Sequence, residues 1–229
     1  MISKIIEIFS SIQGEGKYLG VQQVFVRFFE CNMHCVWCDT PHSIGDTTRR
    51  FKELNLEEVL SQIRHLYRGC RSVSLTGGEP LLQKDFIKAL LPLLKNEGMP
   101  SYLETNGTCP QELSEIIDDV DIVAMDIKLP SSTECRAYWQ EHADFLKIAL
   151  EKDVFVKTVV SSKTKGEDVI RASHLVADID PNVLFILQPN YFDMNNGVIQ
   201  KCREYQILCE EKLHNVRIIP QVHKFMKVR

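Results

Sequence analysis

Short apolar, β-branched runs alternate with longer stretches of helical period along almost all 229 residues of the chain. The expected strands are 23–28, 72–75, 101–104, 122–125, 154–160 and 183–187, with a final extended piece at 216–220. The expected helices are 56–66, 86–94, 112–117, 134–150, 167–177 and 197–213. Such alternation favours right-handed crossovers between parallel strands. We predict an α/β fold, a partial and open TIM-like barrel of about six strand–helix units with a mainly parallel sheet.

Composition narrows the class of protein. The length suits one domain spanning residues 1–229. The formal net charge of −4 argues against nucleic acid or an anionic membrane as the main partner. No apolar run approaches the roughly 18 residues that span a bilayer. The first residues, interrupted by Glu7, are too polar for a signal peptide, so we expect a cytoplasmic protein.

Polar motifs follow the ends of four expected strands. These are Thr76-Gly-Gly-Glu79, Thr105-Asn-Gly107, Asp126-Ile-Lys128 and Gln188-Pro-Asn190. In parallel α/β folds, ligands bind at the carboxyl ends of the strands. The four motifs are therefore expected to converge on one cavity.

Three cysteines follow the first expected strand with the spacing C-x3-C-x2-C. Cys31, Cys35 and Cys38 could hold three irons of a [4Fe–4S] cluster and leave the fourth iron open to another ligand, whereas electron-transfer clusters use four cysteines. The alternative is a structural zinc site with His34 or His42 as the fourth ligand. The other five cysteines are expected to be buried, inert thiols.

Together these segments resemble the radical S-adenosylmethionine superfamily and, within it, the 7-carboxy-7-deazaguanine synthase family. The cysteine motif and the segment Leu75-Thr-Gly-Gly-Glu-Pro80 carry the superfamily resemblance. The family resemblance rests mainly on Ile12-Gln-Gly-Glu-Gly16 and Trp37-Cys-Asp-Thr40. Further matching pieces are Phe25-Val-Arg27, Glu104-Thr-Asn-Gly107, Asp126-Ile-Lys-Leu-Pro130 and Pro220-Gln-Val-His-Lys224.

The resemblance implies a ring-contracting carbon–nitrogen lyase. Its cofactors would be a [4Fe–4S] cluster on Cys31, Cys35 and Cys38, S-adenosylmethionine cleaved to a 5′-deoxyadenosyl radical, and Mg²⁺. The radical would take hydrogen from C6 of 6-carboxy-5,6,7,8-tetrahydropterin, and rearrangement with loss of ammonia would give 7-carboxy-7-deazaguanine for queuosine or another 7-deazapurine. A flavodoxin-like electron donor and a homodimer are also implied.

The resemblance further assigns residues to the cofactor. Residues expected to contact S-adenosylmethionine are Trp37, Cys38, Asp39, Gly78, Glu79, Asp126, Ile127, Lys128, Gln188, Pro189, Asn190 and Tyr191. Trp37 would cover the adenine, and Glu79 would accept a hydrogen bond from the ammonium group. Asp126 and Lys128 could instead form a salt bridge at the rim of the barrel.

Another set is expected at the substrate. It comprises Ile12, Gln13, Gly14, Glu15, Arg27, Thr76 and His223, with Thr40 as a ligand of Mg²⁺. Arg27 would bind the substrate carboxylate, but pairing with Glu30 or Glu15 is its structural alternative. Thr40 could instead cap a loop, the segment around Gly14 could be a plain turn, and His223 could belong to a solvated tail.

Two departures from the family pattern concern the substrate pocket. Glu30 precedes the first cysteine where the family usually has glycine, and the chain ends at Arg229 without a proline that contacts substrate in some members. The runner-up function is a glycyl-radical-enzyme activase, whose substrate is a protein. A zinc-stabilised binding module is the third alternative.

Overall fold

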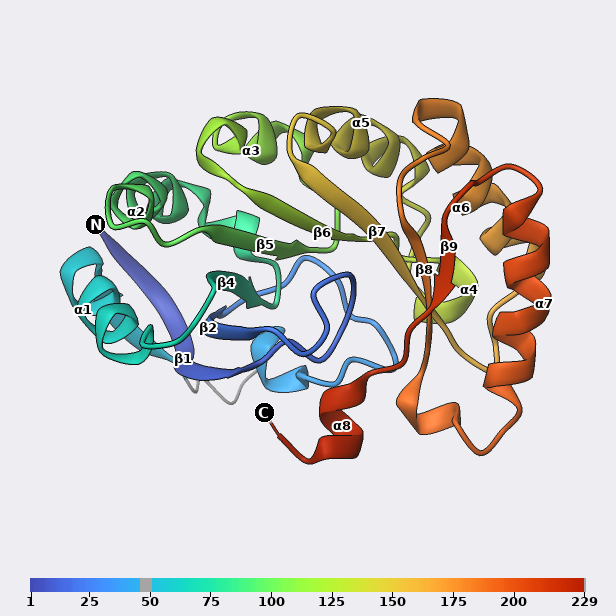
Figure 1. The fold of residues 1–229 in the computed structure, drawn as a ribbon, viewed down its shortest axis with the longest axis horizontal. Coiled ribbons are helices and arrows are strands. Elements are labelled where there is room, and N and C mark those ends of the chain that lie inside the picture. The colour runs from blue at the N-terminus through green and yellow to red at the C-terminus, as the bar shows by residue number, and fades with distance from the viewer. Residues whose placement is uncertain (46–50, 229) are drawn as a thin grey trace.

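A computed structural model describes residues 1–45 and 51–228 of the chain. The fold is built on one sheet of nine strands (Figure 1). The strands are β1 (Ile2–Ile12), β2 (Gln22–Phe28), β3 (Lys52–Asn55), β4 (Ser72–Gly77), β5 (Ser101–Thr105), β6 (Ile122–Asp126), β7 (Asp153–Val160), β8 (Phe185–Pro189) and β9 (Val216–Ile218). The order across the sheet is β3-β1-β2-β4-β5-β6-β7-β8-β9. β3 and β9 therefore form open edges, and the barrel is not closed.

Helices connect the strands and cover the outer face of the curved sheet (Figure 1). The α-helices are α1 (Leu56–Leu66), α2 (Lys84–Asn96), α3 (Pro110–Ser114), α4 (Pro130–Thr133), α5 (Trp139–Ala149), α6 (Gly166–Ile179), α7 (Val198–Glu210) and α8 (Val222–Met226). Short 3₁₀ helices are η1 (Pro41–Ser43), η2 (Pro80–Gln83), η3 (Ile117–Asp119) and η4 (Tyr191–Asp193). The main core lies between these helices and the sheet.

The predicted architecture is confirmed. All strands from β2 to β9, apart from β3, pair in parallel, and a helix follows each of the six parallel strands that precede β9. Helix α1 has the predicted bounds because Asn55 and Glu58 form a capping box, in which each side chain bonds to the other residue's backbone N–H. Its buried face consists of Val59, Leu60 and Ile63.

The N-terminal strand β1 was not among the predicted strands. It pairs antiparallel with both β2 and β3, and its register against β2 shifts between Ile5 and Glu7. This irregularity interrupts the alternation of apolar and polar residues by which a strand is identified in a sequence. The predicted helix 134–150 also differs, because the chain first forms α4 and an irregular segment, and α5 begins only at Trp139.

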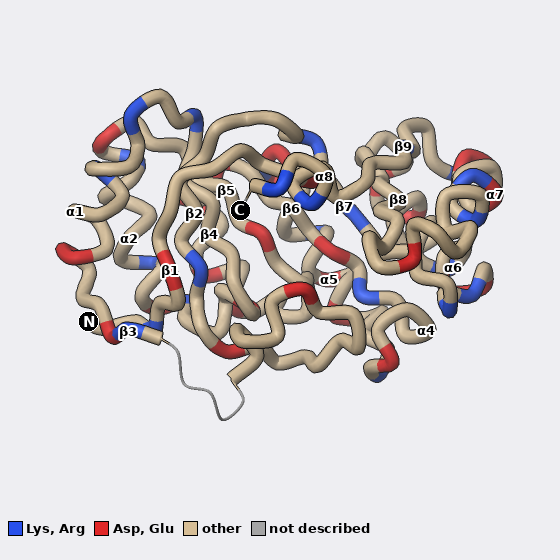
Figure 2. The backbone as a smooth tube through the Cα atoms, turned by 90° about the horizontal axis from the view of Figure 1, so that it is seen from below, with Lys and Arg blue, Asp and Glu red and all other residues tan. Residues whose placement is uncertain are grey.

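Charged residues of both signs are interspersed along the backbone (Figure 2). This distribution agrees with the near balance of 27 basic and 31 acidic residues. Among the described residues, none of the helices has both the length and the apolar character needed to cross a membrane.

Candidate active site

The cavity that holds the predicted site lies at the carboxyl ends of the parallel strands. It has a volume of about 330 Å³. Successive strands contribute Thr76, Glu104, Asp126, Lys157 and Gln188 to its wall. The expectation that the strand-end motifs converge on one cavity is confirmed.

The cysteine loop forms another wall of this cavity. Cys31, Cys35 and Cys38 all line it, and all three are free thiols. Burial raises the pKa of Cys31 and raises that of Cys35 to about 12, so these thiols are protonated at neutral pH until a metal displaces the proton. His34 and His42 are exposed and do not line the cavity, so the structure does not favour either as a fourth zinc ligand.

Close backbone packing fixes the start of this loop against the end of β4, the neighbour of β2 in the sheet. A Cβ atom added to Gly78 would lie 2.0 Å from the carbonyl oxygen of Glu30, and the N–H of Glu79 donates to that same oxygen at 2.8 Å. Glu30 itself has a φ of 81°, in the left-handed region that favours glycine. This conformation gives a physical reason for the glycine usual at this position. The Glu30 side chain pairs with Lys4 at 2.7 Å and does not line the cavity.

Substituting Gly78 by alanine is therefore expected to destabilise the protein and displace the cysteine loop. Backbone atoms cannot move aside as a flexible side chain can, so we expect a loss of about 1–3 kcal/mol in the free energy of unfolding, measured by urea titration. Gly166→Ala is the matched control, because its Cβ would lie 3.4 Å from the Tyr205 ring, at the start of α6. Equal stability of the two variants would contradict the role of the contact between Gly78 and Glu30.

Two strand-end side chains carry buried acceptor atoms without a partner among the described residues. Oδ1 of Asp126 and Oε1 of Gln188 are both in this state, and both residues line the cavity. Buried polar atoms are nearly always hydrogen-bonded in folded proteins, so a ligand with hydroxyl or N–H donors fits this wall. The other carboxylate oxygen of Asp126, Oδ2, accepts from Lys128 Nζ at 2.8 Å. The salt bridge considered as an alternative is thus present, and it leaves Oδ1 to a ligand.

Trp37 and Lys128 lie together beside the cysteines. The Lys128 ammonium is 5.0 Å from the centroid of the Trp37 ring, and the indole N–H donates to the Ser132 backbone oxygen at 2.6 Å. These contacts fix the ring at the cavity wall. Both residues line the cavity, as do Asp39 and Asn190.

Thr40 follows the last cysteine and also lines the cavity. Its Oγ1 atom lies 3.9 Å from Cys38 Sγ and 3.4 Å from Ser43 Oγ. Although Thr40 precedes helix η1, its side chain makes no capping hydrogen bond. Its backbone oxygen instead accepts from Ser43 Oγ at 2.7 Å. The loop-capping alternative for the Thr40 hydroxyl is thus not observed.

The turn around Gly14 meets the C-terminal helix at the rim of the cavity. The N–H of Val222 donates to the Gly14 carbonyl at 2.9 Å, and a Cβ at Gly14 would lie 2.3 Å from His223 Nδ1. Gly14 is needed because any larger residue would push His223 away. Ile12, Gln13, Glu15 and His223 all line the cavity, so the turn and the tail are both brought to the site.

Arg27 extends from β2 into the cavity, while its neighbours Val26 and Phe28 face the core. Its Nε donates to Glu7 Oε1 at 3.0 Å, and its guanidinium lies 5.7 Å from the centroid of Phe9. The predicted alternative partners were Glu30 and Glu15, and the described partner is instead Glu7 on the neighbouring strand β1.

Four residues expected at the cofactor are not among those that line the cavity: Glu79, Ile127, Pro189 and Tyr191. Glu79 is fully buried and accepts hydrogen bonds from Thr105 Oγ1 and from two backbone N–H groups. In this structure it therefore links the segment after β4 to the segment after β5. Burial outweighs these donors and raises the pKa of Glu79 to about 7. Ile127 belongs to the apolar core, and Tyr191 lies against Phe225 at the surface.

Comparison with known proteins identifies the family. The Radical SAM superfamily model matches residues 26–168. The chain is 39% identical to the 7-carboxy-7-deazaguanine synthase of Geobacter sulfurreducens, across 96% of this chain and 95% of that one. The chain belongs to the 7-carboxy-7-deazaguanine synthase family of the radical SAM superfamily. The synthase of Archaeoglobus fulgidus is 33% identical across the full length of both chains.

A solved structure of this family has the same fold. The crystal structure of QueE from Escherichia coli superposes with a TM-score of 0.70 at 26% identity, covering 97% of this chain and 95% of that one. Membership of the superfamily implies a [4Fe–4S] cluster and S-adenosylmethionine as cofactors. The residues present fit both groups, because three thiols face the cavity and unpartnered acceptors at Asp126 and Gln188 face it as well.

Sequence reasoning missed several residues that line this family's cavity here. The charged or polar ones that had no assigned role and lie outside the strand-end motifs are Glu7, Ser43, Glu104, Lys157, Gln221 and Lys224. A usable signal existed for Lys157, because it is the only charged residue between Val154 and Val160, in an otherwise apolar or small segment.

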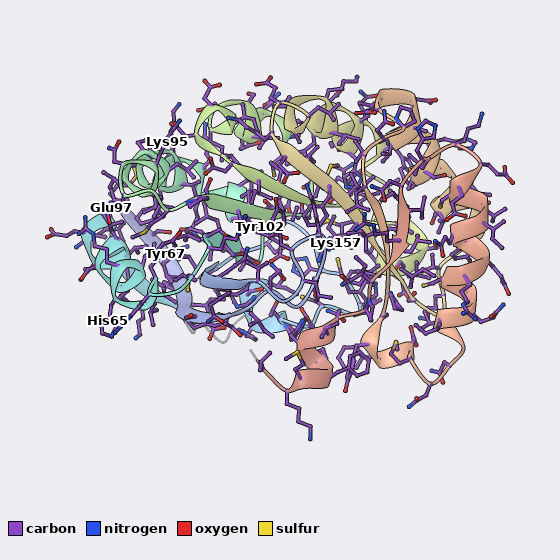
Figure 3. All side chains as sticks on the ribbon, viewed as in Figure 1. His65, Tyr67, Lys95, Glu97, Tyr102 and Lys157 are labelled. Carbon is purple, nitrogen blue, oxygen red and sulfur yellow. The ribbon has the colours of Figure 1, made fainter. Side chains whose placement is uncertain are left out.

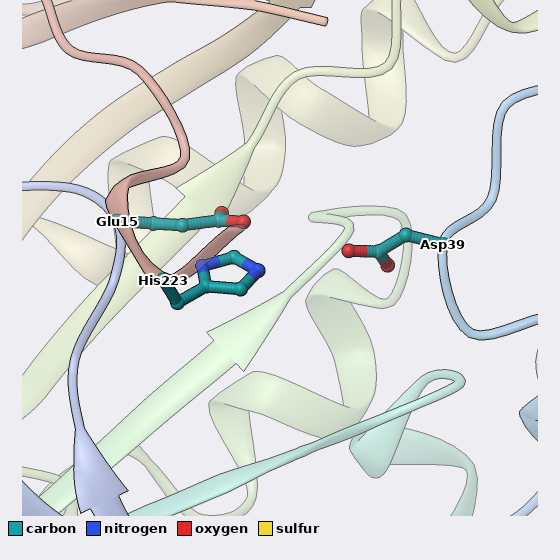
Figure 4. A group of neighbouring side chains, drawn as sticks. All are labelled: Glu15, Asp39 and His223. Carbon is teal, nitrogen blue, oxygen red and sulfur yellow. The ribbon is translucent and has the colours of Figure 1, made fainter. Parts of the chain in front are cut away.

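Glu15, Asp39 and His223 form a group whose ligand atoms lie within 4.8 Å of one another (Figure 4). Their carboxylates already have cationic or N–H partners. Glu15 pairs with Lys157 and accepts from Gln221 Nε2 at 2.8 Å, and Asp39 pairs with Lys224 at 3.1 Å. The group is therefore part of an ion-pair network at the rim of the cavity.

Proposed function

We propose that this protein converts 6-carboxy-5,6,7,8-tetrahydropterin to 7-carboxy-7-deazaguanine with loss of ammonia, as a single radical SAM domain over residues 1–229. The observation that carries the proposal is the convergence of three free cysteines and Arg27 on one cavity. The 39% identity to a named 7-carboxy-7-deazaguanine synthase over almost the whole chain supports it.

One side of the cavity suits the cofactors. Cys31, Cys35 and Cys38 would hold the cluster, and Asp126 and Gln188 would accept hydrogen bonds from the sugar hydroxyls of S-adenosylmethionine. When bound, these groups supply the 5′-deoxyadenosyl radical that abstracts hydrogen. Trp37 would provide an apolar wall for the adenine, held in place by Ser132.

Other residues of the same lining suit a carboxylated pterin. Arg27 would bind the substrate carboxylate, and Thr40 would contribute a hydroxyl ligand to Mg²⁺, which prefers oxygen donors and keeps several waters. Gln13 and Glu15 would bind the edge of the pterin ring. A substrate held in this cavity would be partly shielded from water, which would help to protect a reactive radical.

Partners and location follow from the chemistry proposed. The cluster requires one-electron reduction, for which we propose a flavodoxin-like donor, and we propose a homodimer by analogy with the family. All eight cysteines are free. Thiols used for a cluster need a reducing compartment, which supports a cytoplasmic location.

Anaerobically reconstituted protein, supplied with a reductant, S-adenosylmethionine, Mg²⁺ and the pterin, tests the proposal. We expect 7-carboxy-7-deazaguanine and free ammonia in equal amounts, detected by mass spectrometry and an ammonia assay. Cleavage of S-adenosylmethionine without this product would refute the substrate assignment and leave the superfamily assignment intact. The relatives named above are synthases and offer no support for the runner-up function as an activase.

A further inference from the structure

Lys157 lies on β7, near the middle of the fold (Figure 3), and lines the cavity. Only 7% of its side chain is exposed. The neighbours Val156 and Thr158 are fully buried on the opposite face of the strand. A lysine is rarely buried unless it is paired, so its partners indicate its role.

Three carboxylates surround this ammonium group. Lys157 Nζ bonds directly to Glu15, and it lies 3.8 Å from both Glu104 Oε1 and Asp126 Oδ2. These residues come from the N-terminal turn, β5 and β6, so one cation joins three separate elements. Asp126 pairs with a second lysine, Lys128. The lysine contacts of Glu15 and Glu104 are with Lys157.

Each of these two glutamates is further oriented by a neutral donor. Thr76 Oγ1 donates to Glu104 Oε2 at 2.8 Å, and Gln221 Nε2 donates to Glu15 Oε1 at 2.8 Å. Two fixed carboxylates on one wall of a cavity form a pair of acceptors. The ligand chemistry that matches such a pair is a flat edge of adjacent N–H donors.

We propose that Lys157 is a positioning residue that pairs with Glu15 and Glu104 and orients both carboxylates as acceptors for a substrate edge of adjacent N–H donors, such as the 2-amino-4-oxopyrimidine edge of a pterin. This inference rests on the proposed function and names the group that would recognise the end of the substrate remote from its carboxylate. It gives the cavity two kinds of recognition group, with Arg27 for an anion and the glutamates for N–H donors.

The electrostatics of Glu15 support this role. Burial alone would raise the pKa of Glu15, but Lys157, with smaller contributions from Gln221 and His223, more than offsets burial and lowers that pKa to about 2. Burial would likewise lower the pKa of Lys157, yet Glu15, Glu104 and Asp126 raise it. The charged and titratable groups around this pair are Glu104, Asp126, Lys128, Tyr102, His223 and Asp39. A carboxylate oxygen of Asp39 lies within 4.8 Å of one of Glu15.

The test compares Lys157→Met, which keeps the volume and removes the charge, with Lys157→Arg, which keeps the charge. The probe is 6-carboxypterin, the oxidised and unreactive analogue, and its binding to reconstituted protein is followed by fluorescence between pH 6 and 8. We expect Lys157→Met to bind about tenfold or more weakly at pH 7, and Lys157→Arg to retain most of the affinity. Lys163→Met, which removes the exposed ion pair with Glu134, is the control and should bind normally.

The pH dependence has an expected sign. In the wild type, Glu15 stays charged throughout this range, so it adds no pH dependence to binding. Without Lys157, burial raises the pKa of Glu15, and protonation as the pH falls removes the acceptor. The ratio of variant to wild-type dissociation constants should therefore grow from pH 8 to pH 6. A ratio that stays near one at every pH would overturn the inference.

Thermal unfolding of the full chain gives a readout that is independent of ligand. The melting temperature of Lys157→Met should rise relative to wild type as the pH falls from 8 to 6, because protonation relieves an unpaired buried carboxylate. If this variant does not fold, the double variant Lys157→Met/Glu15→Gln should fold and lose the pH dependence, and failure to do so would overturn the inference. A wild type that makes no product would refute the proposed function, while the melting data would still decide the coupling of Lys157 to Glu15.

Discussion

Alanine at any one of Cys31, Cys35 and Cys38 is expected to abolish both the iron–sulfur cluster and the cleavage of S-adenosylmethionine. Three thiolates from one loop hold the cluster, and the lining residues of the cavity include no other cysteine. A variant with two thiolates has no replacement thiolate among the described residues that line the cavity. Iron and sulfide content, with the brown absorbance of the protein, measure the cluster, and 5′-deoxyadenosine formation should fall below detection.

Cys70→Ala is the matched control for these variants. This thiol is partly buried near Ser10 and Leu66, outside the cavity, so its loss should leave iron content and cleavage unchanged. Full iron content in the Cys35→Ala variant would contradict the assigned ligands. Colourless wild-type protein with one bound zinc would instead support the zinc-stabilised module, which was left open by the spacing of the cysteines.

The local sequence pattern predicted most of the fold correctly. The parallel part of the sheet was predictable because each buried strand forms a short apolar run, followed by a helix with its own apolar face and cap. Strand β1 was not predictable in this way, since its pairing with two strands and its register shift are tertiary features. The same limit applies to α8, a helix of five residues whose position depends on Gly14.

The site was predictable where its residues follow strand ends, and less so elsewhere. The cysteines, Thr76, Asp126 and Gln188 all converge as expected, because parallel strands present their carboxyl ends at one side. Lys157 was not predicted as a site residue. Its segment is recognised as a strand by the apolar residues around it, and that pattern indicates no role for the single lysine. The partner of Arg27 was predicted incorrectly because Glu7 lies on the unpredicted strand β1.

Replacing Arg27 with methionine is expected to lower kcat/KM for the carboxylated pterin by roughly 10²- to 10³-fold. Removing one partner of a buried, hydrogen-bonded charge pair costs about 2–5 kcal/mol, and the substrate carboxylate would be left without its cation. Cluster content and cleavage of S-adenosylmethionine without substrate should remain normal. The control is Arg64→Met on α1, which removes a more exposed pairing with Glu97 and should have little effect on kcat/KM.

The contact with Glu7 supplies the competing explanation, in which Arg27 only supports the N-terminal strand. Binding of two unreactive ligands, 6-carboxypterin and unsubstituted pterin, separates the two roles. If Arg27 binds the carboxylate, the wild type should prefer the carboxylated ligand and Arg27→Met should lose that preference. If Arg27 only holds β1 through Glu7, the variant should weaken both ligands by the same factor, because the distortion does not depend on the ligand's charge. Only the first result assigns Arg27 to the substrate.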